Sequence, residues 1–231
     1  MTTRLIVDNT SKLKELNEPE QPSAVRLAAR IISYIFHPIF VPVYIAYFLI
    51  IIQPVLFSGF TGPEKIFIIL RFLLMYSFFP LVTVLLCKAL GFLDSIYLKT
   101  RKERIIPYIT CMIYYFWMWY VLRNQPEFAP PVVELTFAIF LASIIGLMVN
   151  IYIKISLHAI SMGIMVTFMI SLAFTQTIAL GLYISIAVLI TGIVCTSRFI
   201  ISDHTPKEIY GGLFAGIAAQ LVAELTRGFL Y

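Results

Sequence analysis

The chain has 231 residues, of which 60% are hydrophobic and only 13% are charged, and its mean hydropathy is +0.92. This composition excludes an ordinary soluble domain and predicts a multi-span membrane protein, because about 20 apolar residues suffice for one membrane-crossing helix. The net charge of +5 would suggest nucleic acid as the partner of a soluble protein. Here, however, Lys and Arg lie between apolar runs, where they indicate topology, lipid headgroups or a phosphate site.

Residues 1–25 form a polar tail ahead of the first apolar run. The tail carries four acidic residues and lacks the basic and then apolar layout of a secretory signal, so we expect no cleavage. The stretch from Ser11 to Asn17 favours a short helix, which Pro19 and Pro22 would end. We therefore expect a solvated tail at residues 1–25 and a single membrane-embedded domain at residues 26–231.

Seven apolar runs follow the tail, at about Ile31–Ile52, Ile66–Leu90, Ile105–Leu122, Val132–Ile153, Ala159–Phe174, Ile178–Thr196 and Ile209–Leu225. The first contains His37, Pro38 and Pro42, which favour a broken or partly inserted helix, and the fifth is short for a bilayer. Gly212 and Gly216 have the small-residue spacing of closely packed membrane helices. The predicted fold is all-α: a polytopic transmembrane helix bundle of six to seven spans.

Three polar clusters interrupt the apolar pattern, at Leu98–Pro107, Ile155–Ala159 and Thr196–Glu208. Ionisable groups near membrane depth are costly and tend to serve function. Two apolar runs separate the first cluster from the second, and two more separate the second from the third. An even number of crossings therefore places all three clusters on the same face of the membrane.

Arg104, His158, Arg198 and His204 can meet at this face, and the combination suits a phosphate group. Arginine forks spread the charge of the phosphoryl oxygens, one neutral imidazole can attack phosphorus, and a protonated imidazole can donate to the leaving oxygen. Carboxylates that could hold magnesium occur only singly, so we expect a mechanism without metal or cofactor. Cys87, Cys111 and Cys195 lie far apart, which argues against a disulfide framework or a zinc site.

The same clusters resemble the three signatures of the type 2 phosphatidic acid phosphatase superfamily, KxxxxxxRP, PSGH and SRxxxxxHxxxD. The third matches most closely: Ser197 and Arg198, five residues, His204, three residues and then Glu208 in place of Asp. The second keeps only the Ser and His of its signature, at Ser156 and His158. The first ends in Arg104-Ile-Ile-Pro instead of Arg-Pro. The resemblance covers residues 99–208.

The resemblance implies a role for each matching residue. His204 would be the nucleophile that becomes phosphohistidine, Glu208 its orienting carboxylate, and His158 the acid that protonates the leaving oxygen. Phosphate would be bound by Arg198, Arg104 and Ser156. Lys99, Arg101 and Lys102 compete for the place of the first-signature lysine, and we favour Arg101 and Lys99.

Some of these residues also have a purely structural interpretation. Thr205-Pro-Lys-Glu208 also reads as a helix capping box, and the basic run 99–104 also fits a cytoplasmic loop. We interpret His37, Asn150 and Gln220 as packing or interhelical hydrogen-bonding residues.

The predicted function is metal-independent hydrolysis of a terminal phosphate from a lipid in the cell (inner) membrane. The alternatives are a lipid phosphotransferase, which uses an alcohol acceptor, and a lipid transporter or scramblase on the same fold. Membrane lipids and a lipid phosphate are the expected partners, and the oligomeric state cannot be read from the sequence. If all seven runs cross, the charge rule places the site in the cytoplasm, whereas bacterial members of the superfamily usually act on the outer face.

Overall fold

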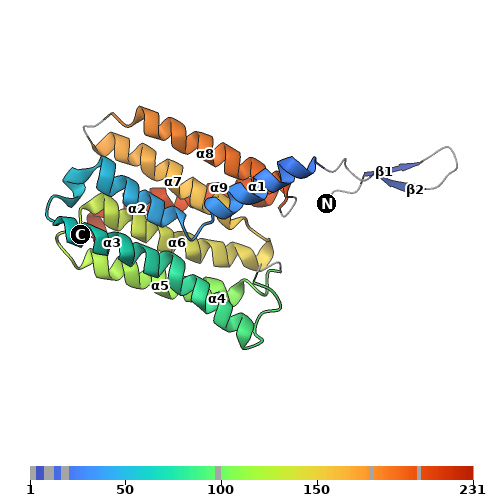
Figure 1. Cartoon of the computed structure of the whole chain (residues 1–231), viewed down its shortest axis with the longest axis horizontal. Coiled ribbons are helices and arrows are strands. Elements are labelled where there is room, and N and C mark those ends of the chain that lie inside the picture. The colour runs from blue at the N-terminus through green and yellow to red at the C-terminus, as the bar shows by residue number, and fades with distance from the viewer. Residues whose placement is uncertain are drawn as a thin grey trace.

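The computed structural model describes residues 4–7, 13–16, 21–96, 100–176, 179–201 and 204–230. Within these residues six helices are long and apolar enough to cross a membrane, and they pack side by side in a bundle (Figure 1). The protein is therefore a multi-pass membrane protein, and the predicted all-α helix bundle is confirmed. The spans are Gly62–Ala89, Ile105–Arg123, Pro130–Tyr152, Leu157–Thr175, Gly181–Ile200 and Pro206–Leu225.

The first of these spans contains three consecutive elements, α3 (Gly62–Leu73), a π-helical turn η2 (Leu74–Phe78) and α4 (Phe79–Ala89). Pro80 follows the π-helical turn, which takes up the mismatch that a proline ring imposes on the preceding turn. The other five spans are α5 (Ile105–Arg123), α6 (Pro130–Tyr152), α7 (Leu157–Thr175), α8 (Gly181–Ile200) and α9 (Pro206–Leu225). A short helix, α10 (Arg227–Leu230), follows α9, and its Arg227 pairs with the buried Glu134 of α6.

The first apolar run is not a continuous helix. It contains α1 (Ser23–Ile35) and α2 (Val41–Ile52), with His37 and Pro38 between them, and the short helix η1 (Pro54–Phe57) follows. Proline lacks an amide hydrogen and disfavours helical backbone at the residue before it, so the helix ends here. The predicted break is confirmed. In Figure 1, α1 and α2 together run from the end of the bundle where α9 begins to the opposite end.

Part of the tail is extended rather than helical. The strand β1 (Arg4–Val7) pairs antiparallel with β2 (Leu13–Leu16), with Val7 opposite Leu13 and Arg4 opposite Leu16. The helix expected from Ser11 to Asn17 is therefore wrong for residues 13–16, and its other residues lie outside the described ones. Pairing supplies backbone hydrogen bonds that a two-turn helix, with its costly nucleus, would provide poorly.

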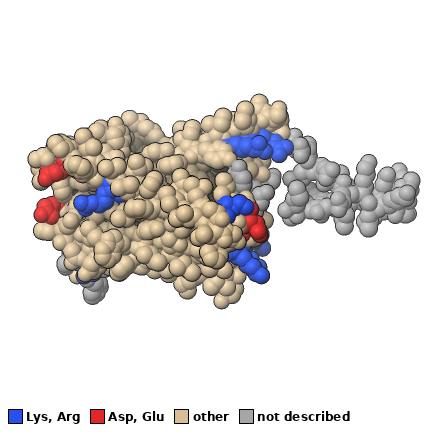
Figure 2. Space-filling model, turned by 60° about the horizontal axis from the view of Figure 1, so that its bottom comes forward, with Lys and Arg blue, Asp and Glu red and all other residues tan. Residues whose placement is uncertain are grey.

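The three polar clusters lie at one end of the bundle, as the crossing count predicts. The starts of α5, α7 and α9 meet the ends of α6 and α8 there, and α1 begins at the same end (Figure 1). Figure 2 shows Lys, Arg, Asp and Glu near the two ends, with a broad uncharged surface between them. Large apolar side chains of the spans, such as Leu85, Ile113 and Leu189, are exposed, as expected for helices that face lipid.

Glycines bring α7 and α9 into backbone contact. A Cβ atom at Gly212 of α9 would lie 2.7 Å from the carbonyl oxygen of Ser156. A Cβ at Gly216 would overlap the carbonyl oxygen of Ile160, and one at Gly163 of α7 would overlap that of Leu213. The close packing predicted from Gly212 and Gly216 is confirmed, and it holds the beginnings of the two helices together.

We predict that Gly216→Ala destabilises the protein by about 1–3 kcal/mol, because the added methyl group meets rigid backbone of the neighbouring helix. Gly211→Ala is the matched control, since a Cβ at this position of α9 meets nothing within 4 Å. The control should be as stable as the wild type, or more stable by up to ~1 kcal/mol in free energy of unfolding. Thermal unfolding in detergent measures both. Equal unfolding temperatures for the two variants would show that the helix contact is looser than described.

Candidate active site

His204 and Glu208 form a hydrogen-bonded pair where α9 begins. The Nδ1 atom of His204 lies 3.0 Å from Oε2 of Glu208, and the same oxygen accepts the backbone N–H of Thr205 at 3.1 Å. The Thr205 hydroxyl accepts the backbone N–H of Glu208 at 3.4 Å, which completes a capping box. Orientation of His204 and capping of α9 are therefore combined in one carboxylate rather than being alternatives.

This arrangement determines which nitrogen of His204 can react. A carboxylate accepts the Nδ1–H, so the lone pair of the neutral ring resides on Nε2. His204 is buried, and burial lowers its pKa below the ordinary value of 6.5. The Glu208 hydrogen bond opposes this shift, whereas the charges of Arg198, Arg104 and Lys154 add to it. The ring is therefore neutral and able to act as a nucleophile at neutral pH.

The charges of cations from three segments act on His204. Arg198 lies in the last turn of α8, and its charge acts on the imidazoles of His204, His158 and His37 alike. Arg104 immediately precedes α5, is buried, and donates from Nη1 to the carbonyl oxygen of Ile155 at 2.9 Å. The first and second clusters are thus joined directly, as the resemblance implies.

Lys154 was not singled out from the sequence, although its charge acts on His204. It lies two residues before Ser156, between α6 and α7, so a basic residue beside the second cluster was the signal that could have revealed it.

Two helices begin beside this group of charges. Ser156 is the N-cap of α7, where its hydroxyl accepts the N–H of Ala159 at 3.5 Å. Its own N–H donates to the carbonyl oxygen of Glu208 at 3.2 Å, which connects the first turns of α7 and α9. Helix N-termini carry partial positive charge and unpaired amides, so the location favours an anion.

His158 is in contact with α1, an element outside the three clusters. Its Nε2 lies 3.0 Å from the carbonyl oxygen of Ser33, which can only accept, so this nitrogen carries a hydrogen. The His37 ring packs edge-on against the His158 ring, with 5.3 Å between their centroids. His37 was interpreted from the sequence as a packing or hydrogen-bonding residue, and the structure places that packing within the site. The His-Pro break in an apolar run was the available signal.

Arg101, a candidate for the place of the first-signature lysine, lies at the end of α6. Arg101 is exposed and donates from Nη1 to the carbonyl oxygens of Ile151 at 3.0 Å and Tyr152 at 2.6 Å, where it stabilises the end of α6. Asn150 donates to the carbonyl oxygen of Arg101 at 2.9 Å, which confirms it as a hydrogen-bonding residue. Lys99 lies outside the described residues. The sequence did not indicate this contact between Arg101 and the end of α6.

The chain matches no family model, no curated protein and no solved structure. Among the residues that the structure describes, no three His, Cys, Asp or Glu side chains are grouped to hold a metal ion.

We predict that Glu208→Gln lowers the pKa of His204 further, because the charged acceptor that stabilises the imidazolium is lost. The amide oxygen of Gln can still accept the Thr205 N–H, so the helix cap remains. Thr205→Ala is the control: it removes a cap, at a cost of about 1 kcal/mol, but leaves the carboxylate beside His204. NMR titration of ¹³C-labelled histidine measures the pKa, and thermal unfolding measures the cap. An unchanged His204 titration in Glu208→Gln would contradict the pairing.

Proposed function

We propose that this protein is a metal-independent lipid phosphatase that works through a phosphohistidine at His204. The observation that carries the proposal is the buried His204–Glu208 pair, which leaves Nε2 as the nucleophilic nitrogen among several cations. The proposal is also supported by the resemblance to type 2 phosphatidic acid phosphatases, whose implied roles the His204–Glu208 hydrogen bond and the charges acting on His204 would suit. The inner membrane of the cell is the proposed location.

In the first step, the Nε2 lone pair of His204 forms a bond to phosphorus while the bond from phosphorus to the lipid oxygen breaks. The electron pair of that bond goes to the lipid oxygen, which takes a proton from the imidazolium form of His158 and leaves this ring neutral. Arg198 and Arg104 spread the charge of the remaining phosphoryl oxygens, and the N-terminal amides of α7 add hydrogen bonds. Glu208 stabilises the positive charge that develops on the His204 ring.

In the second step, a water molecule attacks phosphorus as the bond to Nε2 breaks, and the electron pair returns to His204. His158 accepts the proton of this water, so it acts first as an acid and then as a base. Inorganic phosphate then leaves. The carbonyl oxygen of Ser33 now occupies the position beside His158 Nε2 that the leaving oxygen would take. Substrate binding therefore exchanges one acceptor for another at this nitrogen.

The position of the site favours a substrate anchored in the bilayer. His204 and Glu208 lie at the end of membrane-spanning helices, so a phosphate headgroup can reach them while its hydrocarbon remains in the membrane. Phosphatidate, phosphatidylglycerophosphate, polyprenyl pyrophosphate and lipid A phosphates share this chemistry.

We expect the purified protein to release inorganic phosphate from a mixture of lipid phosphates in EDTA, and His204→Ala to reduce release to background while remaining folded. Phosphate release measures turnover, and acid-labile ³²P on the protein reports the phosphohistidine. A labelled lipid product without inorganic phosphate would instead indicate a phosphotransferase. Absence of both products would instead favour a lipid transporter or scramblase.

We predict that the loss caused by His158→Ala depends on the leaving group. General acid catalysis contributes about 10²–10⁴-fold, so phosphorylation by a lipid monoester should slow by roughly that factor. p-Nitrophenolate leaves without a proton, so phosphorylation by p-nitrophenyl phosphate should slow far less. Burst kinetics isolate this step from phosphohistidine breakdown. Equal losses on both substrates would assign His158 to phosphate binding or to the contact with α1.

A further inference from the structure

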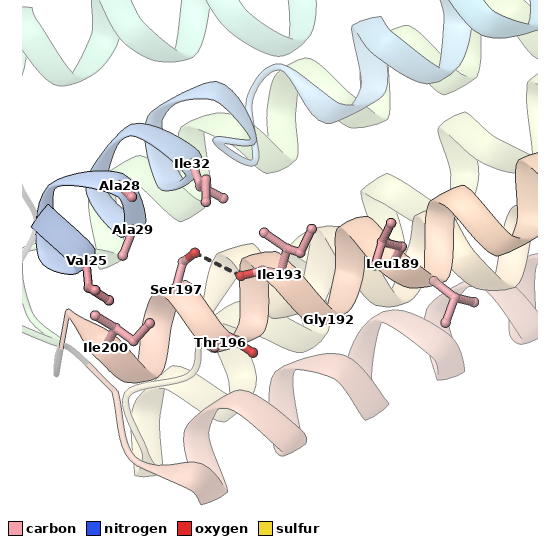
Figure 3. A pocket seen from close by; sticks show the side chains of 11 residues that line it. Val25, Ala28, Ala29, Ile32, Leu189, Gly192, Ile193, Thr196, Ser197 and Ile200 are labelled. Atoms are coloured by element: carbon pink, nitrogen blue, oxygen red, sulfur yellow. Dashed lines mark hydrogen bonds between the residues drawn. The ribbon is translucent and has the colours of Figure 1, made fainter. Parts of the chain in front are cut away.

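A groove of about 490 Å³ lies between α1 and α8, outside the cluster of charged residues (Figure 3). Val25, Ala29 and Ile32 line it from α1, and Leu189, Gly192 and Ile193 line it from α8. Its size is within the usual range for ligand sites, and its walls are almost entirely aliphatic.

Each wall of the groove includes a residue that is next in the chain to a residue at the candidate active site. On α1, Ile32 lines the groove, and the carbonyl oxygen of the next residue, Ser33, meets Nε2 of His158. On α8, Ser197 lines the groove and the next residue is Arg198, whose charge acts on His204. On both walls, therefore, a lining residue is the chain neighbour of a residue that contacts or acts on a site histidine.

The lining is suited to hydrocarbon rather than to a polar ligand. The Ser197 hydroxyl donates to the carbonyl oxygen of Ile193 at 2.8 Å, so it is already paired within its own helix (Figure 3). Gly192 leaves space on the α8 wall, since a Cβ there would meet nothing within 4 Å. Leu189 is 62% exposed, and α8 is a membrane-spanning helix, which leaves the groove accessible from lipid.

We propose that the α1–α8 groove binds the hydrocarbon chain of the phosphate-bearing lipid while its phosphate lies between Arg198 and His204. The inference rests on the proposed function and adds to it the place on the protein where the apolar chain of the substrate binds. The aliphatic walls disfavour a polar headgroup, and the chain neighbours Ser33 and Arg198 place the groove beside the site, unlike the general lipid-facing surface.

The test is Gly192→Leu, which fills the groove without displacing backbone. Gly211→Leu is the matched control, because Gly211 also lies within a helix with open space at its Cβ and does not line the groove. For a long-chain phosphatidate, kcat/KM should fall by roughly tenfold or more in Gly192→Leu, since the chain loses its apolar contacts. Hydrolysis of p-nitrophenyl phosphate, which has no chain, should stay within about twofold of wild type. The control should match wild type on both substrates.

Three results would overturn the groove assignment. These are an unchanged rate on long-chain phosphatidate, equal losses on the two substrates in Gly192→Leu, and the same long-chain loss in Gly211→Leu. If the wild-type protein hydrolyses neither substrate, a binding measurement decides the groove, and the proposed function itself fails only if no lipid phosphate of the mixture is hydrolysed. A phosphatidate with a diazirine on its acyl chain should then crosslink to α1 and α8 in the wild type but not in Gly192→Leu. Excess phosphatidate should prevent this crosslinking and excess phosphatidylcholine should not; crosslinking that fails either condition also overturns the assignment.

Discussion

Three glycines allow the backbones of α7 and α9 to touch, and the candidate site depends on this contact. Side chains at Gly163, Gly212 or Gly216 would separate the helices, because each added Cβ would lie against backbone of the other helix. At the end of the contact, the Ser156 N–H reaches the carbonyl oxygen of Glu208. The N-cap of α7 and the His204–Glu208 pair of α9 are therefore held next to each other.

The charges of the site are tolerated because the polar groups have defined partners. Glu208 accepts from both His204 and Thr205, and Arg104 donates to the carbonyl oxygen of Ile155. Burial strengthens these interactions and also maintains His204 in its neutral form. Several cations with two helix N-termini favour an anion at this location, and the proposed phosphoryl transfer depends on such preorganised positive charge.

The break in the first apolar run brings residues to the site that do not belong to the three polar clusters. Because the helix ends before Pro38, α1 lies against α8 and brings Ser33 and His37 to His158. The same placement creates the apolar groove beside Arg198. In the proposed mechanism, the helix break thus places α1 where it contacts His158 and also forms one wall of the groove for the lipid chain.

The sequence alone was sufficient for properties that depend on local pattern and order. Apolar runs of membrane length predicted the spans, the prolines after His37 predicted the break, and counting crossings placed His158 and His204 at one end. Capping chemistry at Thr205 and Glu208 was likewise readable, because a capping box involves residues only three apart. Tertiary structure alone decided that Arg101 binds the end of α6, that Lys154 acts on His204 and that Ser33 meets His158. Ser33 and His158 are 125 residues apart in the chain, and a contact of that kind depends on how whole helices pack, which no local spacing encodes.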